Sequence, residues 1–221
     1  MHRNRNHAHQ LNMLVPLLMA VGQHVQRLDF LPTVTLAVLA FNAYVFLQTV
    51  GRNLTPFCIS APKVLAGNYA VVLYNTFVHA DQMHLYYNSL SFLHKGVQLE
   101  RKFGALGLLW FIFLSSLLTP LFYILISVIM GPLFSPGCAV GFSGVIFALK
   151  VLCQHHFPSA ALVMGIPLPA WGVAWGELIA ISLVTPNASF VGHLAGILAG
   201  LTIIYSPKVT GVLRGGGGRR T

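Results

Sequence analysis

Long apolar runs follow one another along the chain, each separated from the next by a short polar or Gly/Pro-rich segment. A helix that crosses a bilayer needs about 20 mostly apolar residues, within a range of about 17 to 25. Six runs are predicted to form such helices, at residues 32–50, 83–99, 105–130, 138–153, 166–184 and 190–205. The pattern therefore predicts an all-α membrane protein, a six-helix transmembrane domain at residues 32–205.

Two segments flank this domain. Residues 1–31 begin with a basic, polar stretch, and an apolar stretch follows at 11–22. This order resembles a signal peptide. Pro16 interrupts the apolar stretch and no small-x-small cleavage site follows, so we expect an uncleaved cytosolic N-terminus with an interfacial helix. Residues 206–221 form a basic, glycine-rich cytosolic tail with no core-forming pattern.

The composition indicates that lipid is the main solvent. Apolar residues make up 56% of the chain and charged residues 8%, whereas a soluble domain carries about 25% charged residues. The net charge of +9 is typical of nucleic-acid-binding proteins, but the basic residues lie between apolar runs and not on a polar domain. The predicted partner is therefore the bilayer and not nucleic acid.

The basic residues also predict the orientation in the membrane. With an even number of spans both termini share one side, and if that side is the cytosol only Arg52 and Lys63 lie opposite. Eleven basic residues then lie at or towards the cytosolic face: Arg3, Arg5, Arg27, Lys95, Arg101, Lys102, Lys150, Lys208, Arg214, Arg219 and Arg220. Because cytosolic loops carry an excess of Lys and Arg, both termini are predicted to be cytosolic.

Four polar residues inside the predicted helices indicate a functional site, since such residues are costly in lipid. His84 and Asn88 are four residues apart and share a helix face, Ser143 lies near the start of the fourth predicted helix, and His193 lies near the start of the sixth. These three helices enter the membrane from the non-cytosolic side. The topology therefore places all four side chains at a similar depth.

The small residues nearby allow helices to pack closely enough for chemistry. Gly192, Gly196 and Gly200 repeat every four residues, a spacing that lets helix backbones approach in lipid. A serine hydroxyl is inert until a neighbouring base activates it, so Ser143 is predicted to be a nucleophile and His193 its base. No Asp or Glu is placed to orient the histidine, which predicts a dyad. The alternative is that the serine and the histidine only pack between helices.

Three motifs together resemble the signature of the rhomboid intramembrane serine proteases. They are G-F-S-G at 141–144, G-H-L-A-G at 192–196 and H-x-x-x-N at 84–88, and the resemblance covers residues 32–205. It implies a six-helix bundle with a buried, water-filled active-site cavity and a Ser143–His193 dyad. No metal and no cofactor are expected, because the three cysteines lack metal-ligand spacing and the histidines at 79 and 84 lie on the opposite side of the membrane from those at 155 and 156.

The resemblance also implies roles for further residues. His84, Asn88 and the backbone N–H of Ser143 would form the oxyanion hole, as the helix N-terminus and the side-chain donors also suggest. Phe147 would stack on the catalytic histidine, and His79 would be structural. The supporting glycines of the motifs are Gly141, Gly144, Gly192 and Gly196.

Four longer stretches resemble the endoplasmic-reticulum rhomboid domain-containing subfamily. They are HADQMHLYYN at 79–88, LERKFG at 99–104, CAVGFSGVIFALKVL at 138–152 and SFVGHLAGILAGL at 189–201. The likeness implies a multi-pass protein of the endoplasmic reticulum that opens its active site to the lumen and cleaves transmembrane substrates in quality control and ER-associated degradation. Degradation machinery is an expected partner; the likeness does not extend to a ubiquitin-binding tail.

Two alternatives and two modifications stay open. A catalytically inactive rhomboid-like protein would bind membrane clients without cleaving them, and a small transporter would show internal repeats, which we do not find. In an oxidising lumen Cys58 and Cys138 are positioned to pair. Asn53 and Asn187 each begin an N-glycosylation sequon on the same side.

Overall fold

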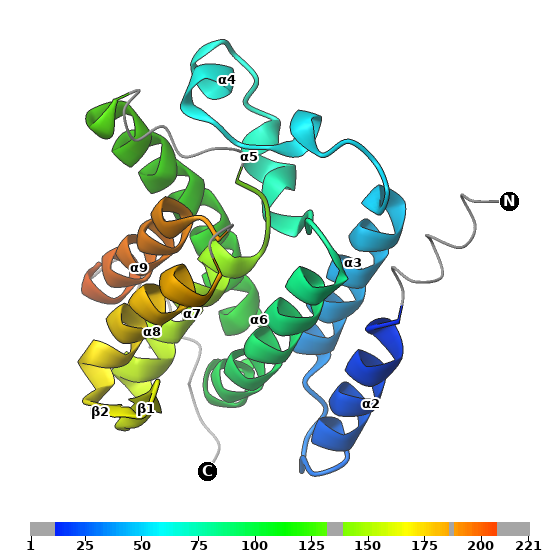
Figure 1. The fold of residues 1–221 in the computed structure, drawn as a ribbon. Helices are drawn as coiled ribbons and strands as arrows, with labels where there is room; N and C mark the ends of the chain where they lie inside the picture. The colour runs from blue at the N-terminus through cyan, green and yellow to red at the C-terminus, as the bar shows by residue number, and fades with distance from the viewer. Residues whose placement is uncertain (1–11, 132–138, 186–187, 207–221) are drawn as a thin grey trace, which may run out of the picture.

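The computed structural model describes residues 12–131, 139–185 and 188–206, which are mostly helical (Figure 1). The longer helices of these residues are α2 (Leu14–Val25), α3 (Thr33–Thr49), α6 (Gln82–Met130), α7 (Ser143–His156), α8 (Ala170–Val184) and α9 (Phe190–Tyr205). Short elements join them: η1 (Thr55–Phe57), α4 (Ala61–Leu65), α5 (Val71–Tyr74), η2 (Asn75–Phe77), β1 (Ala161–Val163) and β2 (Ile166–Leu168).

Helix α6 contains the predicted second and third apolar runs as two arms. Gly104 interrupts it with φ 72° and ψ 174°, a backbone conformation that glycine adopts without the steric cost of a side chain. A Cβ at this glycine would meet no atom within 4 Å, so its backbone conformation and not crowding favours glycine there. The predicted boundary between residues 99 and 105 is confirmed at this break.

The predicted six spans are only partly matched by helix lengths. Among the described residues, α6 is the one helix long and apolar enough to cross a membrane, while α2, α3, α8 and α9 are shorter apolar helices. The six-span arrangement therefore stays a prediction. Two predicted boundaries are wrong: α7 begins at Ser143 and not at 138, and residues 166–168 form β2 instead of the start of α8.

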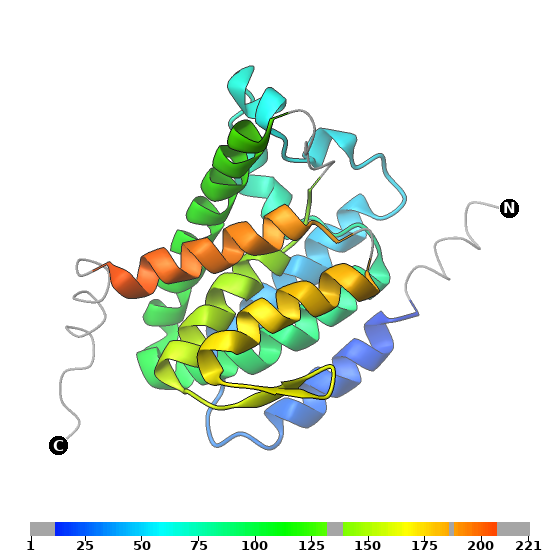
Figure 2. The same cartoon turned by 60° about the vertical axis from the view of Figure 1, so that its left-hand side comes forward.

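The antiparallel β1–β2 hairpin is the exception to an all-α fold, and its turn explains it. Met164 and Gly165 both have positive φ, 50° and 80°, which folds the apolar stretch back on itself. Pro169 then precedes α8, where the fixed φ of a proline suits the start of a helix. Figure 2 shows the hairpin beneath α8.

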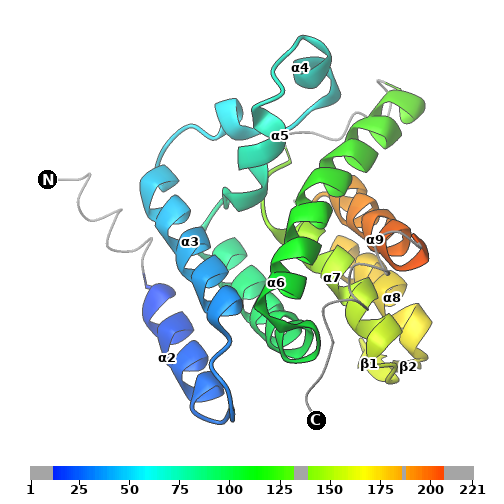
Figure 3. The ribbon, with the colours of Figure 1, turned by 180° about the vertical axis from the view of Figure 1, so that it is seen from behind.

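Helix α7 is the centre of the packing. Every residue from Gly144 to Cys153 is buried, as expected for a helix that has neighbours on all sides. Figure 3 shows α2 and α3 on one side of the bundle and α8 and α9 on the other, with α6 between them. The site described below lies at the first turn of α7.

The buried carboxylate of Glu100 joins α6 to the start of α3. It accepts hydrogen bonds from the backbone N–H groups of Val34 (2.9 Å) and Thr35 (2.8 Å). The hydroxyls of Thr33 (3.2 Å) and Thr35 (2.7 Å) also donate to it. The first N–H groups of a helix have no partner within it, and a carboxylate there also stabilises the helix dipole.

We expect Glu100→Ala to lower the free energy of unfolding by about 2–3 kcal/mol, because it leaves buried donors without an acceptor. Equilibrium unfolding in mixed detergent micelles measures the change. Asp29→Asn is the matched control: it breaks the exposed Asp29–Arg101 ion pair, whose contribution is about 0–1 kcal/mol. Equal losses in the two variants would contradict the capping role of Glu100.

Candidate active site

Ser143 and His193 meet where α7 and α9 begin. Ser143 is the first residue of α7, His193 lies in the first turn of α9, and 3.0 Å separate Ser143 Oγ from His193 Nε2. The imidazole is 5% exposed. A serine hydroxyl at this distance can donate its hydrogen to a neutral imidazole nitrogen, the geometry that general-base activation of a nucleophile requires.

The ring of His193 is held by stacking instead of by a carboxylate. Phe147, one turn after Ser143 in α7, lies parallel to the imidazole, with 4.5 Å between ring centroids and 25° between ring planes. The Nδ1 atom of His193 is buried and has no hydrogen-bond partner among the described residues. The arrangement is a serine–histidine pair in which packing fixes the plane of the imidazole.

Glycines bring α7 and α9 close enough for this pair to form. A Cβ on Gly196 would lie 2.2 Å from the backbone O of Gly144 and 3.0 Å from Cβ of Phe147. One turn later, a Cβ on Gly200 would lie 2.7 Å from the backbone O of Ala148. A side chain at Gly196 or Gly200 would push the two helices apart, so these two glycines allow the close contact of α9 with α7.

His84 lies against the loop that leads to Ser143. A Cβ on Gly141 would lie 2.5 Å from Cε1 and 2.8 Å from Nε2 of His84, and Gly141 has φ 120°. The Nδ1 atom of His84 accepts a 3.4 Å hydrogen bond from the backbone N–H of Ala80. A neutral ring with Nδ1 as acceptor carries its proton on Nε2, so the donor nitrogen is the one beside Gly141.

Asn88 follows one turn later in α6 and is buried. Its Nδ2 group has no hydrogen-bond partner within the described part of the chain. A buried amide without a partner is costly, and such groups are explained by a ligand, a water molecule or a catalytic role. Asn88 therefore keeps a donor free for a bound group.

His79 is buried behind His84 and belongs to the scaffold of the site. Its Nδ1 lies 3.1 Å from the backbone O of Phe77, and its ring meets that of His84 edge-on at 5.2 Å. Burial, and secondly the nearby His84, lower the pKa of His79 to about 3. The ring is therefore neutral at pH 7 and donates from Nδ1 to the carbonyl.

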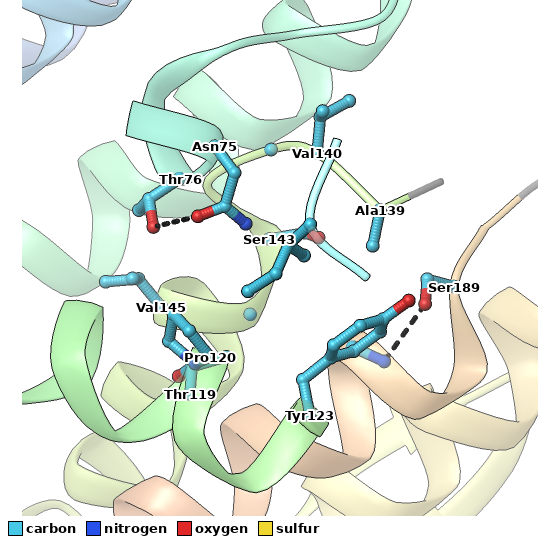
Figure 4. A pocket seen from close by; sticks show the side chains of 14 residues that line it. Asn75, Thr76, Thr119, Pro120, Tyr123, Ala139, Val140, Ser143, Val145 and Ser189 are labelled. Carbon is cyan, nitrogen blue, oxygen red and sulfur yellow. Dashed lines mark hydrogen bonds between the residues drawn. The ribbon is translucent and has the colours of Figure 1, made fainter. Parts of the chain in front are cut away.

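A small cavity adjoins Ser143 on the side of α6 (Figure 4). Its volume is about 40 Å³, enough to hold a water molecule. The sequence-based prediction missed the polar groups that line it: Asn75, Thr76, Thr119, Tyr123 and Ser189. They come from a loop without periodicity and from an apolar run, so no spacing pattern points to them.

The loop before Ser143 is fixed at several points. The backbone N–H of Gly141 donates to the carbonyl of Asn75 over 2.9 Å, and Ile59 pairs with Ala139 in an antiparallel bridge. Cys58, next to this bridge, is disulfide-bonded, and Cys153 is free. The other residue of the predicted pair, Cys138, lies outside the described residues.

The structure describes the asparagine of one of the two predicted sequons. Asn53 is exposed, and its Oδ1 accepts from the backbone N–H of Thr55 over 2.9 Å. Asn187 lies outside the described residues. Glycosylation of either residue stays a prediction.

Known proteins resemble the chain over most of its length. Residues 66–207 match the family model described as the Rhomboid domain. The chain is 41% identical to Rhomboid-related protein 4 of Mus musculus over 199 residues, 86% of this chain and 63% of that protein. It is 40% identical to Rhomboid-related protein 4 of Homo sapiens over 204 residues, 89% of this chain and 64% of that protein.

A plant relative is more distant. The chain is 33% identical to "Rhomboid-like protein 14, mitochondrial" of Arabidopsis thaliana over 207 residues, 87% of this chain and 61% of that protein. The chain thus spans less than two thirds of the length of these curated relatives.

We expect Gly196→Ala to separate α7 from α9 and to break the Ser143–His193 hydrogen bond. Overpacking of this kind costs about 1–3 kcal/mol of stability. Thermal unfolding and covalent labelling by a fluorophosphonate, which reacts with activated serines, measure the two effects. The control is Gly22→Ala, because a Cβ at Gly22 meets nothing within 4 Å. Unchanged labelling of a folded Gly196→Ala variant would refute the role of the close crossing.

Proposed function

Since the chain belongs to the rhomboid family, we propose that it is an active intramembrane serine endopeptidase that cleaves transmembrane segments of membrane proteins. The observation that carries the proposal is the 3.0 Å contact between Ser143 Oγ and His193 Nε2. Both members of the pair are present, whereas a non-catalytic, client-binding member of the fold needs neither. The intact pair therefore favours the enzyme over that alternative.

In the proposed reaction His193 acts first as a base and then as an acid. Nε2 takes the proton of the Ser143 hydroxyl as the oxygen attacks the carbonyl carbon of the scissile peptide bond. The protonated His193 then gives this proton to the leaving amine, and an acyl-enzyme remains. Water, activated by the same imidazole, hydrolyses the ester and restores the serine.

The negative charge that develops on the carbonyl oxygen needs donors that are already in place. The backbone N–H of Ser143, at the first position of α7, is not used by the helix itself. The free Nδ2 of Asn88 and the Nε2 of His84 supply further donors. Donors fixed in a site of low dielectric stabilise such a charge more than water does.

A transmembrane substrate has to unwind before it reacts. In a helix the peptide bond is shielded by its own hydrogen bonds and side chains, so we propose that the substrate docks near the first arm of α6 and α8 and opens locally. The cavity beside Ser143 supports the hydrolytic step, because it offers a polar space for water next to the nucleophile.

We further propose that the protein works in the quality control of membrane proteins in the endoplasmic reticulum, with degradation machinery as a partner. The support is the 40–41% identity to Rhomboid-related protein 4 and the four stretches named above. One plant relative carries the word mitochondrial in its name. Imaging of the tagged chain with markers for both organelles distinguishes the two locations.

The proposal predicts that proteolysis depends on both members of the pair. The chain is co-expressed with a tagged single-span protein that has a helix-destabilised transmembrane segment, and fragments are detected by immunoblotting. We expect a fragment with the intact chain and none with Ser143→Ala or His193→Ala. Thr202→Ala removes an exposed hydroxyl of α9 and should cleave normally. Binding without any fragment, across several unstable substrates, would favour the client-binding alternative.

The oxyanion-hole roles predict a defect in rate. Removal of one such donor lowers kcat by about 10²–10³-fold in characterised enzymes, so we expect a loss of this order in Asn88→Ala and in His84→Ala. KM should change little, because the interaction forms in the transition state. His94→Ala removes an exposed histidine of the same helix and should stay within about twofold of the unmodified chain. Normal kcat in Asn88→Ala would make Asn88 a packing residue.

A further inference from the structure

An ion pair between α7 and α8 takes no part in the proposed reaction. Lys150 Nζ contacts the carboxylate of Glu177, and each residue lies in the interior of its helix. Lys150 is 7% exposed, and the side chain of Glu177 is 34% exposed. Charged residues inside apolar helices are costly in a membrane protein, so their presence suggests a function.

Glu177 lies where the packing of α8 ends. Ala174 and Leu178 pack against Phe147 and Val151 of α7 and Ile197 of α9. After Leu178 no residue of α8 is buried, and the last turn of the helix exposes large apolar side chains. The ion pair therefore lies near the end of the packed part of α8, beyond which Ile181 is the residue of this helix that still packs, partly buried, against the cluster.

The packed part of α8 covers Phe147, the residue that stacks on the proposed catalytic base, His193. Phe147 stacks on His193, and the packed half of α8 lies on Phe147. Lys150 Nζ is itself 5.9 Å from the centroid of the Phe147 ring. A movement of α8 away from α7 would therefore uncover the flank of the serine–histidine pair.

The charges of Lys150 and Glu177 favour the position of α8 against α7. Lys150 is buried, and surroundings of low dielectric disfavour an unpaired charge there. Glu177 is the acidic residue in contact with this lysine. If α8 moved outward, a cation would be left in surroundings of low dielectric, where the loss of a partner is most costly.

We propose that the Lys150–Glu177 ion pair is a latch within the membrane that holds α8 against α7 and restricts the entry of transmembrane substrates to Ser143. The inference rests on the proposed function, because a latch of this kind matters to an enzyme that admits substrates from the side. It makes Lys150 and Glu177 residues that set access, not residues that touch the reacting atoms.

The first experiment measures the position of α8 directly. Nitroxide labels at Tyr87→Cys of α6 and Ile179→Cys of α8, both exposed positions, report the distance between the helices by pulsed electron paramagnetic resonance. Cys58 is disulfide-bonded and Cys153 is buried, so the reagent favours the introduced cysteines. We expect Lys150→Met/Glu177→Gln to lengthen and broaden the distance distribution; an unchanged distribution would overturn the latch.

The second experiment separates access from chemistry. Lys150→Met/Glu177→Gln removes the pair without leaving a charge behind, and Lys150→Glu/Glu177→Lys restores a pair with reversed signs. If the latch limits access, we expect the neutral variant to cleave a transmembrane substrate about three- to tenfold faster, because more molecules are open. Labelling of Ser143 by a small fluorophosphonate should stay within about twofold, since a small probe does not need the helix to move.

The charge-reversed variant should return the cleavage rate towards that of the unmodified chain. Asp29→Asn, which breaks the exposed ion pair with Arg101, is the matched control and should change neither readout. Cleavage at the normal rate in the neutral variant would overturn the proposal. Parallel losses of cleavage and labelling would also overturn it, because the pair would then support the catalytic residues.

The two experiments keep this inference distinct from the proposed function. If the unmodified chain cleaves no substrate while the neutral variant moves α8, the proposed protease fails and the latch stands. If the unmodified chain cleaves its substrate and α8 does not move in the neutral variant, the proposed protease stands and the latch fails. For variants that unfold early on heating, Glu177→Asp is the milder substitution, which shortens the acidic side chain by one methylene and should shift the distance in the same direction.

Discussion

The backbone contact between α7 and α9 is the constraint on which the rest of the site depends. Lipid is as apolar as the side chains of the protein, so helices in a membrane associate through close packing and hydrogen bonds. A Cβ at Gly196 would lie 2.2 Å from the carbonyl oxygen of Gly144, so this contact requires glycine. Ser143 is the first residue of α7 and His193 lies in the first turn of α9, and the crossing therefore fixes the distance between the hydroxyl and the imidazole.

The absence of a carboxylate beside His193 among the described residues changes how the base is oriented. In a triad an acidic residue holds the tautomer and the plane of the imidazole. Here Phe147 holds the plane by stacking, and Nδ1 has no hydrogen-bond partner within residues 12–131, 139–185 and 188–206. The position of the base then depends on the close packing of α7 against α9, and on Phe147 within α7. A site organised by packing is sensitive to helix movements in a way that a triad is not.

Sequence spacing predicted the parts of the site that follow helix geometry, and it missed the parts that do not. The glycine repeat in α9 and the one-turn spacing of Ser143 and Phe147 depend on the helical period, and both contacts are present. The hairpin at 161–168 was missed because two residues with positive φ reverse an apolar run whose composition also suits a helix. The cavity and the Lys150–Glu177 pair join distant segments, and no spacing within one segment reveals such partners.

The four acidic residues of the chain show why Glu177 differs from the others. Asp81 caps the start of α6, Glu100 caps the start of α3, and Asp29 lies in an exposed ion pair with Arg101. The carboxylate of each of these three lies at the start of a helix or in water, where unpaired N–H groups, the helix dipole or solvent stabilise a negative charge. Glu177 lies inside α8, where no helix end compensates the charge and Lys150 of another helix does. The free energy of the Glu177 charge therefore depends on how far α8 lies from α7. An interaction can hold a helix in one position only if its free energy differs between the two positions in this way.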